Sequence, residues 1–417
     1  MAIAGDNLCL PLEIIHNILK RLLPVKSVEK IGGDNPFLPL DIIRNILKRL
    51  PVKSLVRFLA VCKDWKNLLE SPDFIAEHYH QSAHSNPLVI CTDFSPNPRY
   101  SRLCLVPYKT ETVEVERIPA MDSLRNLDRI IGSSNGLLCV VLLNGVYNHS
   151  PPPSLLLLNP ATREVRQVPR SAKDKALGWG FGLCPVVRDY KIVRIYATNC
   201  PSIKFDEDGG IHGEVFSLRT GSWKEVESGA LRRLRAFPCE PLTFNGAIFW
   251  LGWGEASVKI VSFDLTMEVF SLIPTPFLIP LRTNPSSQIV LDVYENKVAV
   301  LYQYGGRLKP SFMDLWVLEE GSGASGKSWG WTKKYSIGPT SWGLSPLYFW
   351  RNEIVFRYIH EVHLLILTAN HELKRFNIYP SIYNVRQKLD YVESLMSMDG
   401  DSFCSTLATI EELSARE

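Results

Sequence analysis

The stretch LLLLNPATREVRQVP at residues 155–169 decides how most of the chain folds. It contains a short apolar run, a polar turn that begins at Asn159 and Pro160, and a second short run that ends in Pro169. Short apolar runs that alternate with Asn, Pro and Gly are typical of β-strands joined by turns, whereas an amphipathic helix needs apolar residues at a spacing of about 3.6. The stretch therefore predicts a β-hairpin.

The same unit recurs along the chain. Related hairpin patterns occupy residues 155–169, 214–226, 260–274, 314–337 and 364–378. An apolar run precedes each of them, at residues 135–143, 189–196, 245–253, 296–304 and 352–358. The hairpins begin near residues 155, 214, 260, 315 and 364, a spacing close to the roughly 40 to 50 residues of a four-stranded propeller blade.

These repeats favour an all-β domain built as a β-propeller of about six blades, because radial repetition protects strand edges without long helices. Residues 86–118 are expected to supply an irregular further blade. The repeat lengths are uneven, so a β-sandwich remains the alternative architecture.

The first part of the chain follows a helical pattern instead. In LPLDIIRNILKRL at residues 38–50 the apolar residues recur at helical spacing, and Pro51 ends the helix. Two further helices are expected around Leu55 and Trp65, and residues 74–80 add a turn or two. A unit of roughly 45 residues buries too little apolar surface to be robust alone, so it should pack on the rest of the chain or on a partner. The predicted fold class is α+β, with a small three-helix domain before the β-propeller.

Composition excludes several classes of protein. The 417 residues carry 46 basic and 43 acidic side chains, a net charge of +3, which gives no general reason to bind nucleic acid or an anionic membrane. No run reaches the roughly 18 to 20 apolar residues of a membrane span, and no secretory signal is visible. The nine cysteines are scattered and form no C-x-x-C pair, so we expect reduced, buried thiols and a location in the cytoplasm or nucleus.

The helical stretch at residues 38–75 resembles the F-box. The features that carry the resemblance are Leu38 with Pro39, the run LPVKSL at 50–55, and CKDW at 62–65. The downstream region resembles the plant F-box-associated domain of the type-1, kelch-like class. Its matching stretches are residues 133–140, 157–169, 180–195, 216–226, 260–270 and 346–356, with YVESL at 391–395 as the usual end.

This resemblance implies a substrate-recognition subunit of an SCF-type ubiquitin ligase. The F-box would dock on a Skp-type adaptor, which links to cullin and RING subunits, and the C-terminal domain would bind an unknown target protein for ubiquitination and degradation. The chain itself would be non-catalytic and would need no cofactor or metal. The expected divisions are residues 1–36 as a partial duplicate of the F-box start, 37–82 as the F-box, 86–395 as the propeller and 396–417 as a polar tail.

The candidate adaptor contacts are the apolar residues of the F-box stretch. They are Leu38, Pro39, Ile42, Ile43, Leu47, Leu50, Pro51, Leu55, Phe58, Val61 and Trp65. Part of this set must form the core of the small domain, and each position is about as well explained by either role. Basic residues outnumber acidic ones between 37 and 70, which could steer an acidic partner.

For the target protein the candidates are weaker. Trp179, Trp253 and Trp342 lie beside glycines in expected loops, where exposed tryptophans could form a binding hot spot.

Two motifs suggest other functions. Residues 321–328 match the P-loop pattern, but the residues that follow read as a strand, so we interpret the stretch as a hairpin loop. The histidines at 78, 80, 84, 360 and 363 lack partners at zinc-site spacing and are interpreted as surface or helix-end residues. A kelch-like propeller enzyme and an F-box protein without ligase function remain the alternatives.

The F-box start occurs twice. LPLEIIHNILKRL at residues 10–22 matches LPLDIIRNILKRL at 38–50 in 11 of 13 positions, but an extra leucine, Leu23, and the absence of a following CKDW break the first copy. We therefore predict that deleting residues 1–32 leaves adaptor binding intact in a pull-down. Loss of the adaptor from that truncated chain would show that the first copy takes part in docking.

Overall fold

The computed structural model describes the chain in segments. They are residues 40–85, 88–96, 99–107, 116–117, 127–142, 153–173, 176–198, 210–232, 234–237, 240–254, 257–276, 288–305, 310–323, 326–340, 344–350, 352–358, 364–367, 373–376 and 385–398. The chain divides into two compact units, one with the helices and the residues from Val392 onward, the other spanning Asn86–Tyr391. No helix in these segments is long and apolar enough to cross a membrane.

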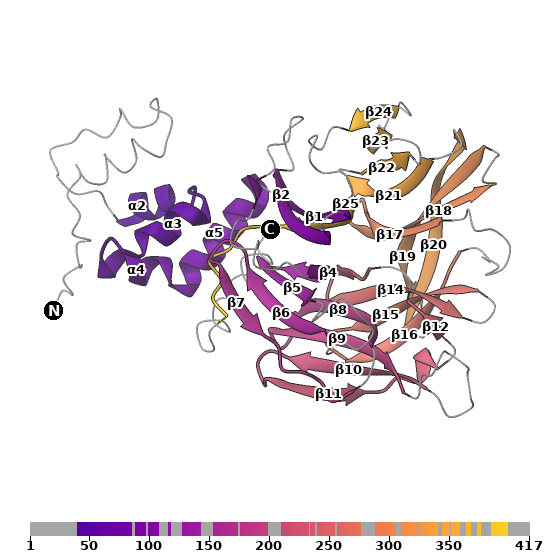
Figure 1. Ribbon diagram of the computed structural model, residues 1–417, viewed down its shortest axis with the longest axis horizontal. Helices are drawn as coiled ribbons and strands as arrows, with labels where there is room; N and C mark the ends of the chain where they lie inside the picture. The colour runs from indigo at the N-terminus through magenta and orange to yellow at the C-terminus, as the bar shows by residue number, and fades with distance from the viewer. Residues whose placement is uncertain are drawn as a thin grey trace. The chain divides into compact units, whose positions relative to one another are not determined.

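The helical unit contains four helices, coloured indigo in Figure 1: α2 (Leu40–Leu47), α3 (Val52–Phe58), α4 (Lys63–Leu69) and α5 (Pro72–Ser85). Their boundaries follow from local chemistry. Pro51 separates α2 from α3, and Cys62 Sγ accepts a hydrogen bond from the Trp65 amide at the start of α4. Ser71 Oγ accepts from the Phe74 amide, and Pro72 occupies the first helical position, where its missing N–H costs nothing. At 14 residues, α5 is longer than the turn or two expected from the sequence.

The core of the helical unit consists of large apolar side chains from all four helices. Phe58 and Trp65 meet edge to face with their ring centroids 5.2 Å apart. The other buried members are Ile43, Leu47, Leu50, Val52, Leu55, Leu69, Phe74, Ile75 and Ala76. Most apolar residues of the helical pattern therefore face inward, and Ile42 is an exception.

A segment from the far end of the chain clusters with this unit. Residues from Val392 onward belong to it, and Leu395, Met396 and Met398 are buried. Sequence reasoning placed 391–395 at the end of the propeller and 396–417 in a polar tail. The structure instead groups 392–398 with the helices, so the helical unit is discontinuous in sequence.

The β unit consists of antiparallel strands. In chain order they are β1 (Leu88–Pro96), β2 (Arg99–Pro107), β3 (Glu116–Arg117), β4 (Leu127–Ser134), β5 (Leu137–Leu142), β6 (Ser154–Asn159), β7 (Glu164–Gln167), β8 (Ala176–Cys184), β9 (Asp189–Ala197), β10 (Ile211–Ser217), β11 (Ser222–Val226), β12 (Leu234–Ala236), β13 (Leu242–Phe244), β14 (Ala247–Gly254), β15 (Val258–Asp264), β16 (Val269–Pro274), β17 (Gln288–Tyr294), β18 (Lys297–Gly305), β19 (Ser311–Gly323), β20 (Gly326–Thr340), β21 (Leu344–Trp350), β22 (Glu353–Tyr358), β23 (Leu364–Leu367), β24 (Leu373–Phe376) and β25 (Val385–Tyr391).

These strands form six sheets, each one blade of a propeller (Figure 1). Five blades follow the chain directly, as β4–β7, β8–β11, β12–β16, β17–β20 and β21–β24. The first strands of neighbouring blades contact one another, as β4 does with β8 and β17 with β21. The expected hairpins and the propeller architecture are confirmed, and the β-sandwich alternative is wrong.

The remaining blade joins the two ends of the unit. Its strand order is β25-β1-β2-β3, so the last strand pairs with the first, and Tyr391 lies opposite Leu88. Ile90 and Tyr391 then pack with Ile130, Leu138 and Val140 of the next blade. Sequence reasoning placed a blade at residues 86–118 but did not identify its fourth strand.

A recurrent turn explains why the hairpin units look alike in sequence. Asn159 Oδ1 accepts hydrogen bonds from the amides of Ala161 and Thr162, at 3.0 and 3.3 Å. Asp264 does the same for Thr266 and Met267 in the β15–β16 turn, at 2.8 and 2.9 Å. A short polar side chain that caps its own turn favours this geometry.

A second recurrent contact involves the prolines at the ends of the hairpin units. Trp223 of β11 donates its indole N–H to the carbonyl oxygen of Pro169, which follows the outer strand of the preceding blade, at 2.8 Å. Trp331 of β20 makes the same bond, also 2.8 Å, to Pro274. The tryptophan of one outer strand therefore fastens the end of the outer strand before it.

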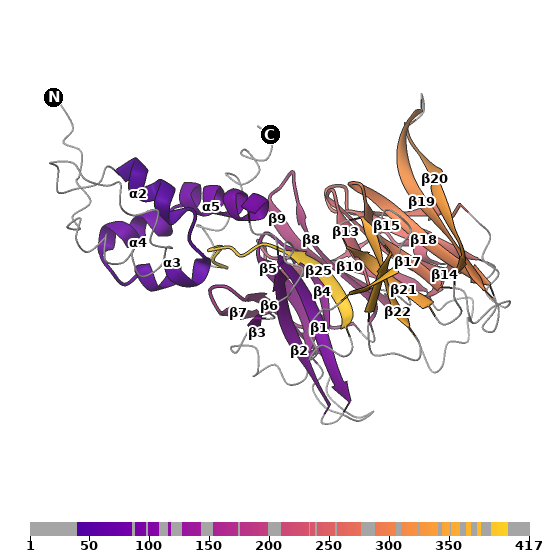
Figure 2. The same cartoon turned by 90° about the horizontal axis from the view of Figure 1, so that it is seen from above.

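The P-loop-like stretch lies in the hairpin of β19 and β20, where Gly321 pairs with Ser328 and Ser322 with Lys327. A phosphate-binding P-loop needs a helix after the loop, so that the helix N-terminal amides face the phosphate. A strand follows here, which confirms the hairpin interpretation. Figure 2 shows this long hairpin extending past the neighbouring strands of its blade.

We predict that ending the chain at Tyr391 destabilises the helical unit, because Leu395, Met396 and Met398 are buried and each such side chain contributes about 1.5–3 kcal/mol. Hydrogen exchange of the amides in α2 to α5 should accelerate at least about tenfold. A chain ending at Met398 is the control and should exchange like the full protein. Equal protection in both truncated chains would contradict the discontinuous unit.

Candidate functional site

The predicted adaptor contacts divide by burial. Ile42 and Pro51 are exposed and Val61 is half-buried. Leu38 and Pro39 lie outside the described residues. The buried members are Ile43, Leu47, Leu50, Leu55, Phe58 and Trp65. The buried set shapes the helical unit from within, and only the exposed and half-buried set is available to touch a partner without rearrangement.

The apolar surface of the helical unit centres on α2. Ile42 is 45% exposed. No other large hydrophobic side chain among the described residues of the four helices is as exposed to solvent. Half-buried apolar side chains add to it, namely Ile46, Val56, Leu59, Val61 and Leu68. Apolar residues that a small domain leaves in water are typical of a docking surface.

An ion-pair cluster holds α2 against α5. Arg44 donates two hydrogen bonds to the Glu77 carboxylate, at 2.9 and 3.1 Å, and Lys48 Nζ lies 3.0 Å from it. Burial alone would raise the pKa of Glu77, but Lys48 and Arg44 outweigh that effect and lower it. Two of the basic residues counted in the sequence thus share one carboxylate within the unit, which reduces by one the excess charge available to steer a partner.

His78 differs from its interpretation as a surface or helix-end residue, because it is buried in the middle of α5. Its Nε2 donates a hydrogen bond of 2.8 Å to the carbonyl oxygen of Leu50, just before Pro51. Burial lowers the pKa of His78, and the bond to Leu50 offsets this only in part, so the ring is neutral at pH 7. A tertiary contact that sequence does not display holds the α2–α3 corner in place. His360 and His363 lie outside the described residues.

Two of the three tryptophans proposed for target binding lie in strands and not in loops. Trp179 is part of β8, where its carbonyl accepts the indole N–H of Trp250 at 2.7 Å and its ring lies 5.3 Å from the Arg194 guanidinium. Trp253 is in β14 and is 43% exposed. Trp342 lies outside the described residues. Of the two that the structure describes, Trp253 is exposed and Trp179 is half-buried.

Arg194 belongs to a buried ion pair. Its Nη1 donates to Glu214 Oε1 at 2.7 Å, and both side chains are almost fully buried. Arg194 also donates to the carbonyl of Lys173, and Ser171 Oγ donates to Glu214 at 2.9 Å. The pair therefore ties the connection between β7 and β8 to the face of the β8–β11 blade, which is a structural role.

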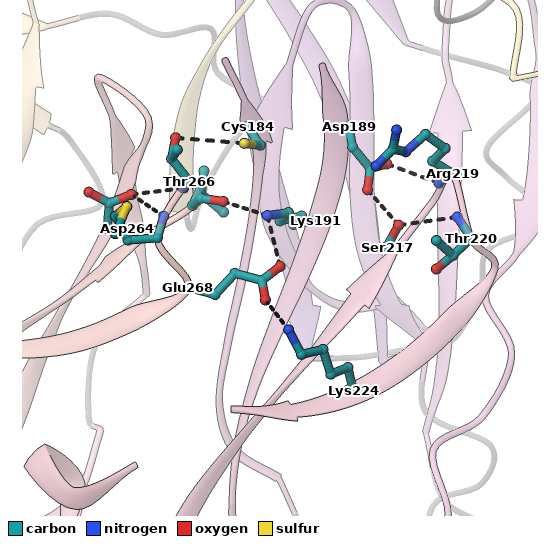
Figure 3. A network of polar contacts seen from close by, with 12 residues as sticks. Cys184, Asp189, Lys191, Ser217, Arg219, Thr220, Lys224, Asp264, Thr266 and Glu268 are labelled. Carbon is teal, nitrogen blue, oxygen red and sulfur yellow. Dashed lines mark hydrogen bonds and ion pairs between the residues drawn. The ribbon is translucent and has the colours of Figure 1, made fainter. Parts of the chain in front are cut away.

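A second polar network joins the β8–β11 blade to the next one (Figure 3). Lys191 is 5% exposed and donates to the carbonyl of Leu265 at 2.6 Å and to Glu268 at 2.9 Å. Glu268 also accepts from Lys224 at 2.9 Å. Burial alone would raise the pKa of Glu268, but the hydrogen bonds from Lys191 and Lys224 prevail and hold it below its usual value.

The same network fixes the turns at the edge of these blades. The buried Asp189 accepts hydrogen bonds from Ser217 Oγ at 2.5 Å and from the Arg219 amide at 2.9 Å. Cys184 Sγ and Thr266 Oγ1 share a hydrogen bond of 3.7 Å (Figure 3). Three turns, after β8, β10 and β15, are thereby held together.

Apolar side chains are exposed on two of these turns. Val186 and Met267 are 69% and 71% exposed, and Pro185 and Val187 are exposed beside them. We name residues 185–187 and Met267 the turn patch. Sequence analysis missed it, and the only available signal was the run Pro185, Val186 and Val187 in a turn where polar residues are usual.

The polar groups of the β unit are arranged as links between blades and turns. Within the described segments, no three His, Cys, Asp or Glu side chains come together in a way that could hold a metal ion. Among the exposed apolar side chains of the described residues, Ile42 is the most exposed of the helical unit, and Val186 and Met267 of the turn patch are the most exposed of the β unit.

Comparisons with known proteins also divide the chain into a helical part and a β part. Residues 36–76 match the family described as the F-box domain, and residues 101–389 match the F-box associated beta propeller domain. Similar proteins of Arabidopsis thaliana include the F-box protein CPR1, which is 26% identical over 69% of this chain and 70% of its own length. A putative F-box/kelch-repeat protein is 26% identical over 69% and 68%, and another F-box protein is 27% identical over 73% and 74%.

We predict that Glu268→Ala destabilises the β unit by about 3 kcal/mol, because it leaves the buried Lys191 ammonium without its counter-charge. Lys224 is 72% exposed, so Lys224→Ala should cost no more than about 0.5 kcal/mol and is the matched control. Urea unfolding at neutral pH measures both.

The contribution of Glu268 should also depend on pH. Its pKa is lower in the folded state than the usual 4.5, so its stabilisation is present above that value and is lost as the pH falls through the folded pKa. The difference between the wild type and Glu268→Ala should shrink in that acid range. Equal stability of the two variants at neutral pH would contradict the role of Glu268.

Proposed function

Because this chain belongs to the F-box proteins that carry an F-box associated beta propeller domain, we propose that it is the substrate-recognition subunit of an SCF-type ubiquitin ligase. The observation that carries the proposal is the presence of both domains in one chain, at residues 36–76 and 101–389. F-box domains bind Skp-type adaptors, and a second domain in the same chain is then free to hold another protein.

The helical unit would be the part that binds the adaptor. Ile42 and the half-buried apolar residues of the helical unit supply surface that gains free energy when a partner covers it, at about 25 cal/mol per Å². Pro51 is exposed at the corner that the His78 bond holds in place. A rigid apolar surface loses little conformational entropy on binding, which favours affinity.

The propeller would bind the target protein. Cullin and RING subunits, joined through the adaptor, would then bring the ubiquitin-transfer chemistry, so this chain needs no catalytic group of its own. Its blades are fastened to each other by buried links such as Lys191 with Glu268 and Trp223 with Pro169, which suits a rigid platform for recognition. A bound target whose turnover does not change when the chain is removed would favour an F-box protein without ligase function.

We predict that Ile42→Asp weakens binding to a Skp-type adaptor by about 30-fold or more, the effect of losing an interface hot spot of about 2 kcal/mol. Titration of the purified chain with adaptor, followed by calorimetry, measures the loss. Ile42 is a better choice than Leu50, whose burial would confuse binding with folding.

Ile42→Leu is the control, because it keeps an apolar side chain of the same size, and it should bind within about threefold of the wild type. Both variants should keep the wild-type melting temperature, since Ile42 is exposed. Undiminished adaptor binding by Ile42→Asp would show that α2 does not face the adaptor.

A further inference from the structure

The turn patch combines high exposure with apolar chemistry. Val186 and Met267 are among the most exposed large hydrophobic side chains of the described residues, and they come from turns in neighbouring blades. The turns touch, since Cys184 and Thr266, the neighbours of Pro185 and Met267, share a hydrogen bond. A Cβ at Gly246, in the β13–β14 turn, would lie 3.2 Å from Pro185. The turns that carry the exposed side chains therefore contact one another.

The patch rests on a rigid base. Lys191 is buried and bonded to Leu265 and Glu268 of the turn that carries Met267, and Asp189, which begins β9 after residues 185–187, fixes the turn after β10 through Ser217 and the Arg219 amide (Figure 3). Burying a lysine and an aspartate is costly unless they are bonded in this way. The result is a set of exposed apolar side chains that need little further ordering when a partner covers them.

The basic and acidic groups near the turn patch differ in their exposure to solvent. Arg219 is exposed, and so is Lys224, which pairs with Glu268. The carboxylates of Asp189, Asp264 and Glu268 are buried or half-buried and already hold hydrogen-bond donors. A partner that approaches the patch therefore meets basic groups first. This arrangement suits a partner that carries carboxylates beside its apolar side chains.

We propose that the turn patch is the docking site for the target protein, and that it binds a segment in which apolar side chains are flanked by aspartate or glutamate. The proposal rests on the function proposed above and names the surface and the chemistry by which the target is chosen. The apolar side chains of the segment cover Val186 and Met267, and its carboxylates pair with Arg219 and Lys224.

A second copy of this chain fits the patch less well. A symmetric dimer through the patch would bring Arg219 and Lys224 of each copy toward the same residues of the other, and like charges across an interface are unfavourable. The charge pattern therefore favours an acidic partner over self-association.

The test uses the full chain purified with a Skp-type adaptor, and synthetic fluorescent peptides as the probe. Three peptide sets share the same leucine and phenylalanine positions and differ only in the residues between them, which are acidic, basic, or serine and glycine. Fluorescence anisotropy should show tightest binding to the acidic set, weakening with added salt.

Val186→Asp and Met267→Asp should each lower that affinity at least about tenfold. Val165→Asp is the matched control, because Val165 is also a highly exposed valine, at 58%, but lies on β7 of the β4–β7 blade, which contributes no residue to the turn patch. It should bind like the wild type. All three variants should keep the wild-type melting temperature.

Three results would overturn the proposal. They are equal binding of the three peptide sets, an equal loss in Val165→Asp, and a concentration-dependent dimer that Met267→Asp abolishes, which would make the partner a second copy. Co-elution with the adaptor is measured separately in every variant. Its absence would count against the ligase function, while the peptide preference would still decide the docking site.

Discussion

The pairing of β25 with β1 is the constraint on which the rest of the β unit depends. Five blades each take all their strands from one continuous stretch of chain, but the sixth needs the last strand of the unit to complete it. Opposite residues such as Leu88 and Tyr391 meet there, and the pair packs on the core of the β4–β7 blade. Without it, β1 would present an unpaired edge and the series of blades would stay open.

Around that pairing, the blades are joined by a few kinds of buried polar contact that use the same chemistry repeatedly. Indole N–H groups reach the carbonyls of prolines in the preceding blade, and buried charged residues such as Arg194 and Lys191 bond to backbone carbonyls and to a carboxylate. These links consume polar groups that could otherwise mark a catalytic site. Exposed apolar side chains such as Val186 and Met267 lie on turns that these links support.

The sequence predicted the parts of the fold that depend on neighbouring residues. Hairpins such as β15–β16 are specified by an Asp or Asn that caps its own turn, and the F-box helices by apolar spacing, so both could be read locally. Contacts between distant residues could not. His78 was assigned to the surface because its bond to Leu50 joins residues 28 positions apart, and β25 was missed as the closing strand for the same reason.

The glycines beside the tryptophans led to a wrong prediction of loops. Gly180 suggested a loop around Trp179, yet it lies within β8, where a Cβ would come within 2.7 Å of the Trp250 ring in the next blade. The glycine serves close packing between blades and not a turn. The turn patch was missed because exposure is a property of the assembled turns, and a Pro-Val-Val run has no such meaning alone.

The closing strand also sets an order of events during synthesis. Roughly 300 residues separate β1 from β25, which a ribosome adds in about 15 to 60 s at about 5 to 20 residues per second. The segment that completes the helical core, Leu395 to Met398, leaves the ribosome later still. A nascent chain therefore keeps an open sheet edge until β25 has been synthesised, and this is the period in which it most needs a chaperone.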